Sequence, residues 1–208
     1  ILGQEEKTLY GPGFILDELC GLSFRISSRS FYQVNATQTE ALYRYAIQMA
    51  NLTGHETVLD AYCGTGTIGL VAAKGLPEHP AAHAARVIGV DNIASAITDA
   101  RNNARHNGIE NASFVTDDAG NFMKEQAKLG NHLDVLLMDP PRAGASEDFL
   151  QATCLLKPER IVYISCNPKT QQRDVTYLIS HGYHLNQVQP VDMFPHTKHT
   201  ENICLLER

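Results

Sequence analysis

A cysteine that follows an apolar run is the residue best placed for covalent chemistry in this sequence. The run Arg160–Ile164 predicts a strand, and Ser165-Cys166-Asn167-Pro168 follows it directly. Asn167 and Pro168 end the strand, and a helix is expected from Lys169. Because a helix N-terminus stabilises negative charge, we expect a lowered pKa for the Cys166 thiol. Three other cysteines are interpreted as small buried apolar residues: Cys20, Cys154 and Cys204.

Glycines with the spacing of a nucleotide-type site lie in an earlier segment, Asp60–Gly69. This segment follows one predicted strand and opens a helix. Glycines let the backbone approach a ligand closely, and the helix N-terminus offers unpaired N–H groups. Gly64, Gly66 and Gly69 also satisfy the G-x-G-x-x-G pattern of dinucleotide sites, so their spacing alone does not choose the cofactor.

Two details of this region favour S-adenosylmethionine. The motif that begins at Asp60 has the D-x-x-C-G-x-G form found in methyltransferases. Asp91 ends the next predicted strand, where its carboxylate can accept hydrogen bonds from both ribose hydroxyls of an adenosine. The alternative for Asp91 is a carboxylate that stabilises the N-terminus of the following helix.

A rigid turn is predicted where Asp139-Pro140-Pro141-Arg142 follows a third apolar run. Two prolines fix the backbone at the carboxyl end of a strand, where ligands bind in open α/β sheets. Asp139 is then expected to point toward the cofactor and the substrate. A purely structural turn is the alternative interpretation.

Alternating strands and helices are expected to position these residues. Strands are expected at Thr57–Asp60, Arg86–Asp91, Ala112–Thr116, Leu133–Met138 and Arg160–Ile164, and helices at Ile68–Lys74, Ala94–Asn107, Ala119–Leu129, Glu147–Leu156 and Lys169–His181. Two further strand-like runs, Tyr183–Asp192 and Asn202–Glu207, have no helix between them. The fold class expected is therefore α/β: a Rossmann-like, mostly parallel sheet that ends in an antiparallel hairpin, the layout of class I methyltransferases.

The chain ahead of this sheet is expected to have two parts. Residues 1–36 predict a β-rich extension, interpreted as the remnant of a longer protein, and residues 37–208 the catalytic domain. A helix is expected over Thr37–Asn51, with Thr37 and Glu40 as a capping box. The proline- and alanine-rich stretch Gly75–Arg86 is expected to be a loop insertion.

Composition limits the setting and the partners. No apolar run is long enough to span a membrane. Five cysteines without a C-x-x-C pair argue against a disulfide framework or a zinc site and for a reducing, cytoplasmic location. The net charge of −6 argues against a nucleic-acid substrate, unless a local basic patch or a missing domain supplies the binding.

The order of motifs resembles that of the RNA uracil-5-methyltransferase family. The resemblance extends from about Tyr10 to the C-terminus. Its motifs are Phe31-Tyr32-Gln33-Val34-Asn35, the glycine loop Asp60–Gly69, Asp139-Pro140-Pro141-Arg142, Ser165-Cys166-Asn167-Pro168 and His199-Thr200-Glu201-Asn202.

This resemblance implies a role for each of several residues. It implies that Cys166 is the nucleophile and Glu201 the general base. Residues implied to contact S-adenosylmethionine are Gln33, Tyr62, Asp91 and Asp139, with Asp139 also near the target uracil. Asp118 is implied near the adenine, with Asp117 as the alternative. The resemblance implies an RNA partner, and we favour ribosomal RNA over transfer RNA. Members of this family often carry an upstream TRAM domain, and some carry an iron–sulfur cluster; neither lies in these 208 residues.

The chemistry of these residue types agrees with that reaction. Carbon 5 of uracil is a poor nucleophile, but a thiolate that adds to carbon 6 creates an enolate whose carbon 5 can attack a methyl sulfonium. A base must then remove the proton from carbon 5. The target base must also leave its stack to enter such a pocket.

Four rival functions fit the sequence less well. A nicotinamide-dependent oxidoreductase shares the glycine pattern, but no residue set in the second half suits hydride transfer. Amino-group methyltransferases carry an aromatic residue where this chain has Arg142, and cytosine-5 enzymes carry a second cysteine where it has Pro141. A binding module without turnover would not need Cys166 and Glu201.

Overall fold

A computed structural model describes residues 7–27, 32–197 and 199–208. The strands are β1 (Phe14–Leu19), β2 (Leu22–Ser27), β3 (Thr57–Ala61), β4 (Arg86–Asp91), β5 (Ala112–Thr116), β6 (Val135–Met138), β7 (Arg160–Ser165), β8 (His184–Val191) and β9 (Glu201–Glu207). The helices are α1 (Ala36–Ala50), α2 (Thr67–Lys74), α3 (Ala94–His106), α4 (Ala119–Lys128), α5 (Glu147–Leu156) and α6 (Pro168–Ser180). None of the helices in these ranges is long and apolar enough to cross a membrane.

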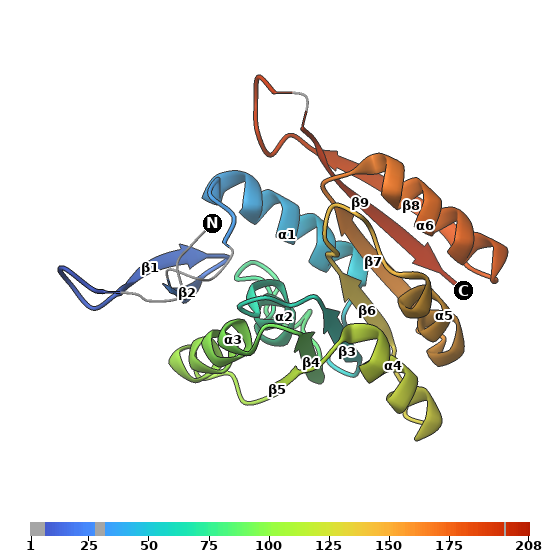
Figure 1. Cartoon of the computed structure of the whole chain (residues 1–208), viewed down its shortest axis with the longest axis horizontal. Helices are drawn as coiled ribbons and strands as arrows, with labels where there is room; N and C mark the ends of the chain where they lie inside the picture. Colours follow the sequence, from blue (N-terminus) through green and yellow to red (C-terminus); the bar gives the residue numbers. More distant parts are fainter. Residues whose placement is uncertain (1–6, 28–31, 198) are drawn as a thin grey trace.

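The central sheet lies between two layers of helices (Figure 1). Consecutive strand residues point to opposite faces, so Val58 joins one apolar cluster with α1, α2 and α3, while Leu59 joins the other with α4 and α5. Helices on both faces explain why the strands read as continuous apolar runs. The expected α/β sheet with a helix after each parallel strand is therefore confirmed.

The order of strands in this sheet is β5-β4-β3-β6-β7-β9-β8. β3 to β7 pair in parallel, whereas β9 is antiparallel to both β7 and β8. The expected antiparallel ending is confirmed, with the last strand of the chain inserted between β7 and β8. Because β9 runs opposite to β7, it begins at the edge where the parallel strands end.

Most element boundaries agree with the sequence expectation, but the cap of α1 does not. The helix begins at Ala36 after Asn35, whose side chain accepts a hydrogen bond from the Gln38 N–H. The expected capping box of Thr37 and Glu40 was wrong, because the Glu40 carboxylate instead accepts the backbone N–H of Cys20 at 2.7 Å. Glu40 thus joins the helix to the β1–β2 hairpin.

The β1–β2 hairpin is joined to α3 through two asparagines one turn apart. The Asn103 side chain accepts the Arg25 N–H at 2.8 Å and donates to the Arg25 carbonyl at 3.3 Å. Asn107 makes the same pair of bonds with Ser23, at 3.0 and 2.8 Å. These side chains satisfy backbone groups of β2 that its partner strand leaves unpaired. Asn103 also donates to the carbonyl of Thr65, so the hairpin is tied to the glycine loop.

The stretch Gly75–Arg86 is a loop, as expected, and it packs onto the body of the protein. Leu76 and Ala84 are buried within it. The Asn111 side chain donates to the Ala84 carbonyl at 2.9 Å, and Glu78 forms an ion pair with Arg44 of α1. The loop therefore has a fixed path between α2 and β4.

Asn103→Ala should lower the free energy of unfolding by about 2–4 kcal/mol, because it leaves part-buried backbone groups of Arg25 and the buried carbonyl of Thr65 without these partners. Urea denaturation would measure this change. Asn102→Ala is the matched control on the same helix, since its side chain makes only a surface hydrogen bond to Arg105. Equal destabilisation by the two variants would contradict the role given to the Asn103 hydrogen bonds.

Candidate active site

A cleft of about 610 Å³ opens at the carboxyl edge of the parallel strands. All seven residues singled out from the sequence line it: Gln33, Tyr62, Asp91, Asp118, Asp139, Cys166 and Glu201. They come from segments as much as 168 residues apart, from Gln33 to Glu201. The structure brings the predicted residues together, while the role of each one stays a prediction.

The glycine loop between β3 and α2 forms one wall of the cleft. At Gly66 the backbone has a φ of +78°, and a Cβ atom there would lie 2.7 Å from the Phe114 ring. At Gly69 a Cβ atom would lie 2.5 Å from a carboxylate oxygen of Asp60. Asp60 itself is buried and accepts the Gly69 N–H at 3.0 Å. Glycine is thus required for packing at both positions, and Gly64 faces the cleft.

Asp91 holds the first turn of this loop from the end of β4. One carboxylate oxygen accepts the Gly64 N–H at 3.0 Å, and the other accepts the Ile93 N–H at 2.9 Å. The carboxylate lines the cleft with lone pairs left over for a ligand. The N-cap residue of α3 is Ile93, whose side chain makes no capping hydrogen bond.

Tyr62 stands in a conformation unusual for its type. Its φ is +62°, in the left-handed region that non-glycine residues rarely adopt. The ring lies against Phe149 of α5, with centroids 5.2 Å apart. Strained backbone of this kind persists where surrounding packing enforces it, and it is enriched at ligand sites.

The two carboxylates predicted to lie near an adenine differ in their position relative to the cleft. Asp118 lines the cleft, whereas Asp117 is not among the lining residues. Asp118 also caps α4, because its side chain accepts the Asn121 N–H at 3.0 Å. Gln33 lines the cleft and is half-buried, while Phe31 of the same motif lies outside the described residues.

Two acidic groups face the Cys166 thiol at the other end of the cleft. Burial and the nearby Glu201 raise the pKa of Asp139 to about 7, and burial raises the pKa of Glu201. The pKa of Cys166 is raised as well, by burial and then by Glu201 and Asp139, against a lowering by Arg142. The expected lowering at the helix N-terminus was wrong, because burial and two carboxylates outweigh the Arg142 guanidinium and the backbone N–H bond.

Asn167 connects the cysteine segment to the segment that carries Asp139. Its side chain accepts the Lys169 N–H at 3.2 Å as the cap of α6 and donates to the Arg142 carbonyl at 3.0 Å. Thr170 donates to the same carbonyl at 3.2 Å. One turn of α6 thereby fixes the backbone that follows the two prolines.

A buried carboxylate that the sequence analysis missed holds the rest of this segment. Asp174 on α6 is fully buried and accepts the Tyr163 hydroxyl at 2.7 Å and the Ala145 N–H at 2.8 Å. Its other oxygen pairs with Arg173, which also donates to the Ala143 carbonyl at 3.2 Å. In the sequence Arg173 and Asp174 look like an ordinary charged pair on a helix surface, so no local signal marks this role.

Two further lining residues, Arg142 and Phe194, were not assigned a site role from the sequence. In the sequence Arg142 argues only against an aromatic residue at the fourth motif position, but in the structure it lines the cleft, and its charge lowers the pKa of Cys166. Phe194 is half-buried and lies in the segment between β8 and β9. The Asn35 side chain donates to the neighbouring Met193 carbonyl at 2.9 Å and so fixes this segment against α1.

Comparisons with known proteins agree with this geometry. The family model described as tRNA (Uracil-5-)-methyltransferase matches residues 20–208. An RNA methyltransferase of Lactiplantibacillus plantarum, described as uncharacterized, is 49% identical over 209 residues, and one of Staphylococcus aureus is 48% identical over 205 residues. These matches cover 100% and 99% of this chain but only 44% and 43% of the relatives.

A solved structure with the same fold comes from Pyrococcus abyssi. It is a tRNA (uracil-54, C5)-methyltransferase in complex with S-adenosyl-L-homocysteine. The TM-score is 0.77 at 32% identity, over 95% of this chain and 45% of that one. A putative S-adenosylmethionine-dependent methyltransferase from Streptococcus mutans, 13% identical with a TM-score of 0.73, shares the fold. The expected class I methyltransferase fold is confirmed.

The contribution of Asp60 to the stability of the wild-type protein should fall as the pH rises from about 4 to about 8, because burial raises the pKa of Asp60 from 3.8 to about 8. Over that range the folded state holds a proton that the unfolded chain releases, which amounts to at most ~1.4 kcal/mol per pH unit. Asp60→Asn has no such proton and can still accept the Gly69 N–H. The melting temperature of this variant should therefore rise relative to that of the wild type as the pH increases. Parallel pH profiles would contradict this account.

Glu201→Gln should speed alkylation of Cys166 by iodoacetamide at neutral pH, because removal of the negative charge lowers the pKa of the thiol. Arg142→Gln should slow it for the opposite reason. Peptide mass spectrometry over a range of pH would follow the reaction. Cys154 is the internal reference, since burial and not a neighbouring charge raises the pKa of its thiol. The same change at both cysteines would count against a direct charge effect.

Proposed function

We propose that this chain, which belongs to the tRNA (uracil-5-)-methyltransferase family, transfers a methyl group from S-adenosylmethionine to carbon 5 of a uridine in RNA. One observation carries the proposal: Cys166, Glu201 and Asp139 share a single cleft with Asp91 and the glycine loop. A thiol, a base and a nucleoside site within one cavity are the parts that this reaction needs.

The end of the cleft over β3, β4 and β5 fits the methyl donor. The Asp91 carboxylate can accept hydrogen bonds from ribose hydroxyls, and Asp118 and Gln33 supply further polar groups. Gly64 lets a ligand approach the backbone, and Tyr62 offers an aromatic face. Bound S-adenosylmethionine supplies an electrophilic methyl group on a positively charged sulfur, which suits an acidic surrounding.

Cys166 begins the reaction in this proposal. After its thiol proton is lost to solvent, the sulfur adds to carbon 6 of the uracil, and the electrons of the carbon 5–carbon 6 bond move to form an enolate. Carbon 5 then attacks the methyl group, and the bond from that methyl to the donor sulfur breaks. Since burial and two carboxylates raise the pKa of Cys166, Arg142 is needed to favour the thiolate.

Glu201 completes the reaction as the base. It takes the proton from carbon 5, the double bond to carbon 6 forms again, and the Cys166 thiolate leaves. Burial raises the pKa of Glu201, which makes its carboxylate a better proton acceptor. Asp139, whose pKa is raised to about 7, can hold a proton at neutral pH and donate it to a uracil oxygen.

The RNA and its full recognition are proposals that reach beyond this chain, which spans less than half of its relatives. The net charge of −6 favours a contribution to RNA binding from another part of the full-length protein. An upstream RNA-binding domain there stays a prediction. So does the preference for ribosomal RNA, while the relative from P. abyssi acts on transfer RNA. Five free thiols support a reducing, cytoplasmic location.

RNA with 5-fluorouridine at the target should form a stable covalent adduct with the wild-type protein, because fluorine cannot leave carbon 5 as a proton. Cys166→Ala should abolish both the adduct and methyl transfer. Glu201→Gln should still attack but fail to remove the proton, so methylated RNA should stay attached on ordinary substrate. A denaturing gel with labelled RNA separates these outcomes, and Cys154→Ala is the control for loss of a half-buried thiol away from the cleft.

An adduct with Cys166→Ala would assign the nucleophile to another cysteine. Absence of any adduct with the wild type would remove covalent catalysis from the proposal. Calorimetric titration of S-adenosylmethionine tests the donor separately. Asp91→Ala should weaken that binding by about 1–3 kcal/mol through loss of hydrogen bonds to a charged group.

A further inference from the structure

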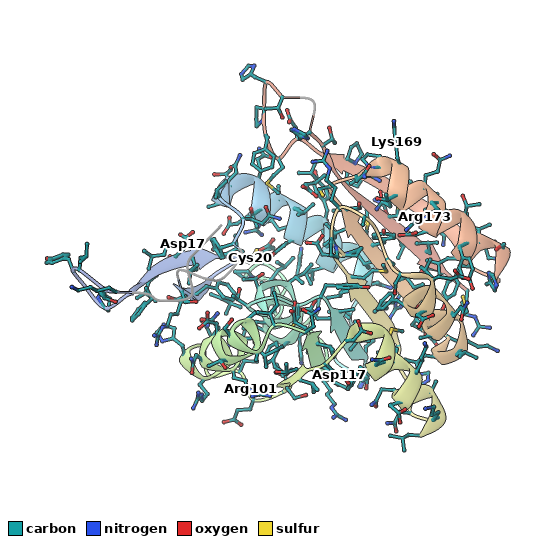
Figure 2. All side chains as sticks on the ribbon, viewed as in Figure 1. Asp17, Cys20, Arg101, Asp117, Lys169 and Arg173 are labelled. Atoms are coloured by element: carbon teal, nitrogen blue, oxygen red, sulfur yellow. The ribbon has the colours of Figure 1, made fainter. Side chains whose placement is uncertain are left out.

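Charge is distributed unevenly around the mouth of the cleft. Asp91 and Asp118 line the end over β4 and β5, with Asp117 next to them in the chain. At the other end, beside Cys166, the cleft is lined by the buried Glu201, the half-buried Asp139 and the exposed Arg142. Helix α6 adds the exposed Lys169 and Arg173. Figure 2 shows Asp117 near β5, well apart from Lys169 and Arg173 on α6. We call Arg142, Lys169 and Arg173 the basic rim.

Hydrogen bonds hold the three members of the basic rim close to one another. The Arg142 carbonyl accepts bonds from Asn167 and Thr170, at 3.0 and 3.2 Å, which places this residue against the first turn of α6. Lys169 lies in that turn. Arg173 follows one turn later and donates to the carbonyls of Ala143 and Ala145. The cations therefore border one surface beside the nucleophile.

Two of the three cations of this rim make no ion pair within the described residues. Arg173 pairs with Asp174 at 2.7 Å, so its charge is offset. Within the described part of the chain, Arg142 and Lys169 have no carboxylate in ion-pair contact, and both side chains are exposed. By contrast, Lys124 and Lys128 on α4 are paired with acidic residues. A polyanion would thus find uncompensated cations at this end of the cleft.

We propose that the basic rim binds the backbone phosphates of the RNA next to the target nucleotide, which extends the proposed function and rests on it. A uridine whose carbon 6 reaches the Cys166 sulfur brings its own phosphates to the mouth of the cleft, and Lys169 lies three residues after that cysteine. The acidic end repels the same phosphates. The RNA strand therefore enters over α6 and leaves the acidic end to the positively charged methyl donor.

Lys169→Glu and a matched Lys157→Glu variant test this surface. Lys157 is also exposed, but it follows α5 at the opposite edge of the sheet, three residues before β7 begins. The probe is a fluorescein-labelled oligouridylate, with affinity measured by anisotropy at stepwise increasing KCl. Lys169→Glu should weaken binding on the order of tenfold at low salt and reduce the slope of log affinity against log salt by ~0.7 or more. Lys157→Glu should leave both unchanged.

The outcomes separate this proposal from the function on which it rests. Wild-type affinity in Lys169→Glu, equal weakening by both variants, or no oligouridylate binding by the wild type would overturn the basic rim. Unchanged S-adenosylmethionine binding in Lys169→Glu, measured by calorimetry, would support a role confined to RNA. If the wild type transfers a methyl group and Lys169→Glu binds oligouridylate with unchanged affinity, the proposed function stands and the role of the basic rim is rejected. Failure of the wild type to bind S-adenosylmethionine would remove both.

Discussion

Parallel pairing of five strands is the constraint on which the site depends. Ala61 of β3 lies opposite Val90 of β4 and Met138 of β6, and Met138 lies opposite Tyr163 of β7. Strands paired in this way end at the same edge, so the residues that follow them meet there. Asp91, Asp139 and Cys166 come together for this reason. Glu201 reaches the same edge by the opposite rule, because antiparallel β9 begins where β7 ends and Asn202 pairs with Ser165.

The concentration of acidic groups at this edge opposes folding and serves the chemistry. Burial and mutual repulsion raise the pKa values of Asp60 and Asp139 to about 8 and about 7, so the folded state favours their neutral forms. A separate network surrounds the buried Asp174 on α6. It satisfies a buried carboxylate with a hydroxyl, a backbone N–H and a guanidinium, and it ties the segment after Asp139 to α6.

Local sequence patterns predicted the elements well where the spacing of apolar residues matches the face that each element buries. β4, β5 and α5 have the expected boundaries, because apolar runs and helical spacing are local properties. The predicted cap of α1 was wrong because the Glu40 carboxylate accepts a hydrogen bond from the Cys20 N–H, a contact that only the folded hairpin creates. The prediction of a lowered pKa for Cys166 was wrong for a similar reason. The helix that follows Cys166 can be predicted from the sequence, but the burial of this cysteine beside Glu201 and Asp139 cannot. No feature of the sequence indicated that Asp174 is a buried carboxylate.

The central claim is that Cys166 activates carbon 5 of a uridine, and isotope release tests it most directly. RNA labelled with tritium at carbon 5 of uridine would be incubated with the protein and S-adenosylmethionine that carries a labelled methyl group. The account predicts one tritium released to water for each methyl group transferred, and loss of both in Cys166→Ala. Methyl transfer without tritium release would place the methyl group elsewhere and contradict the account.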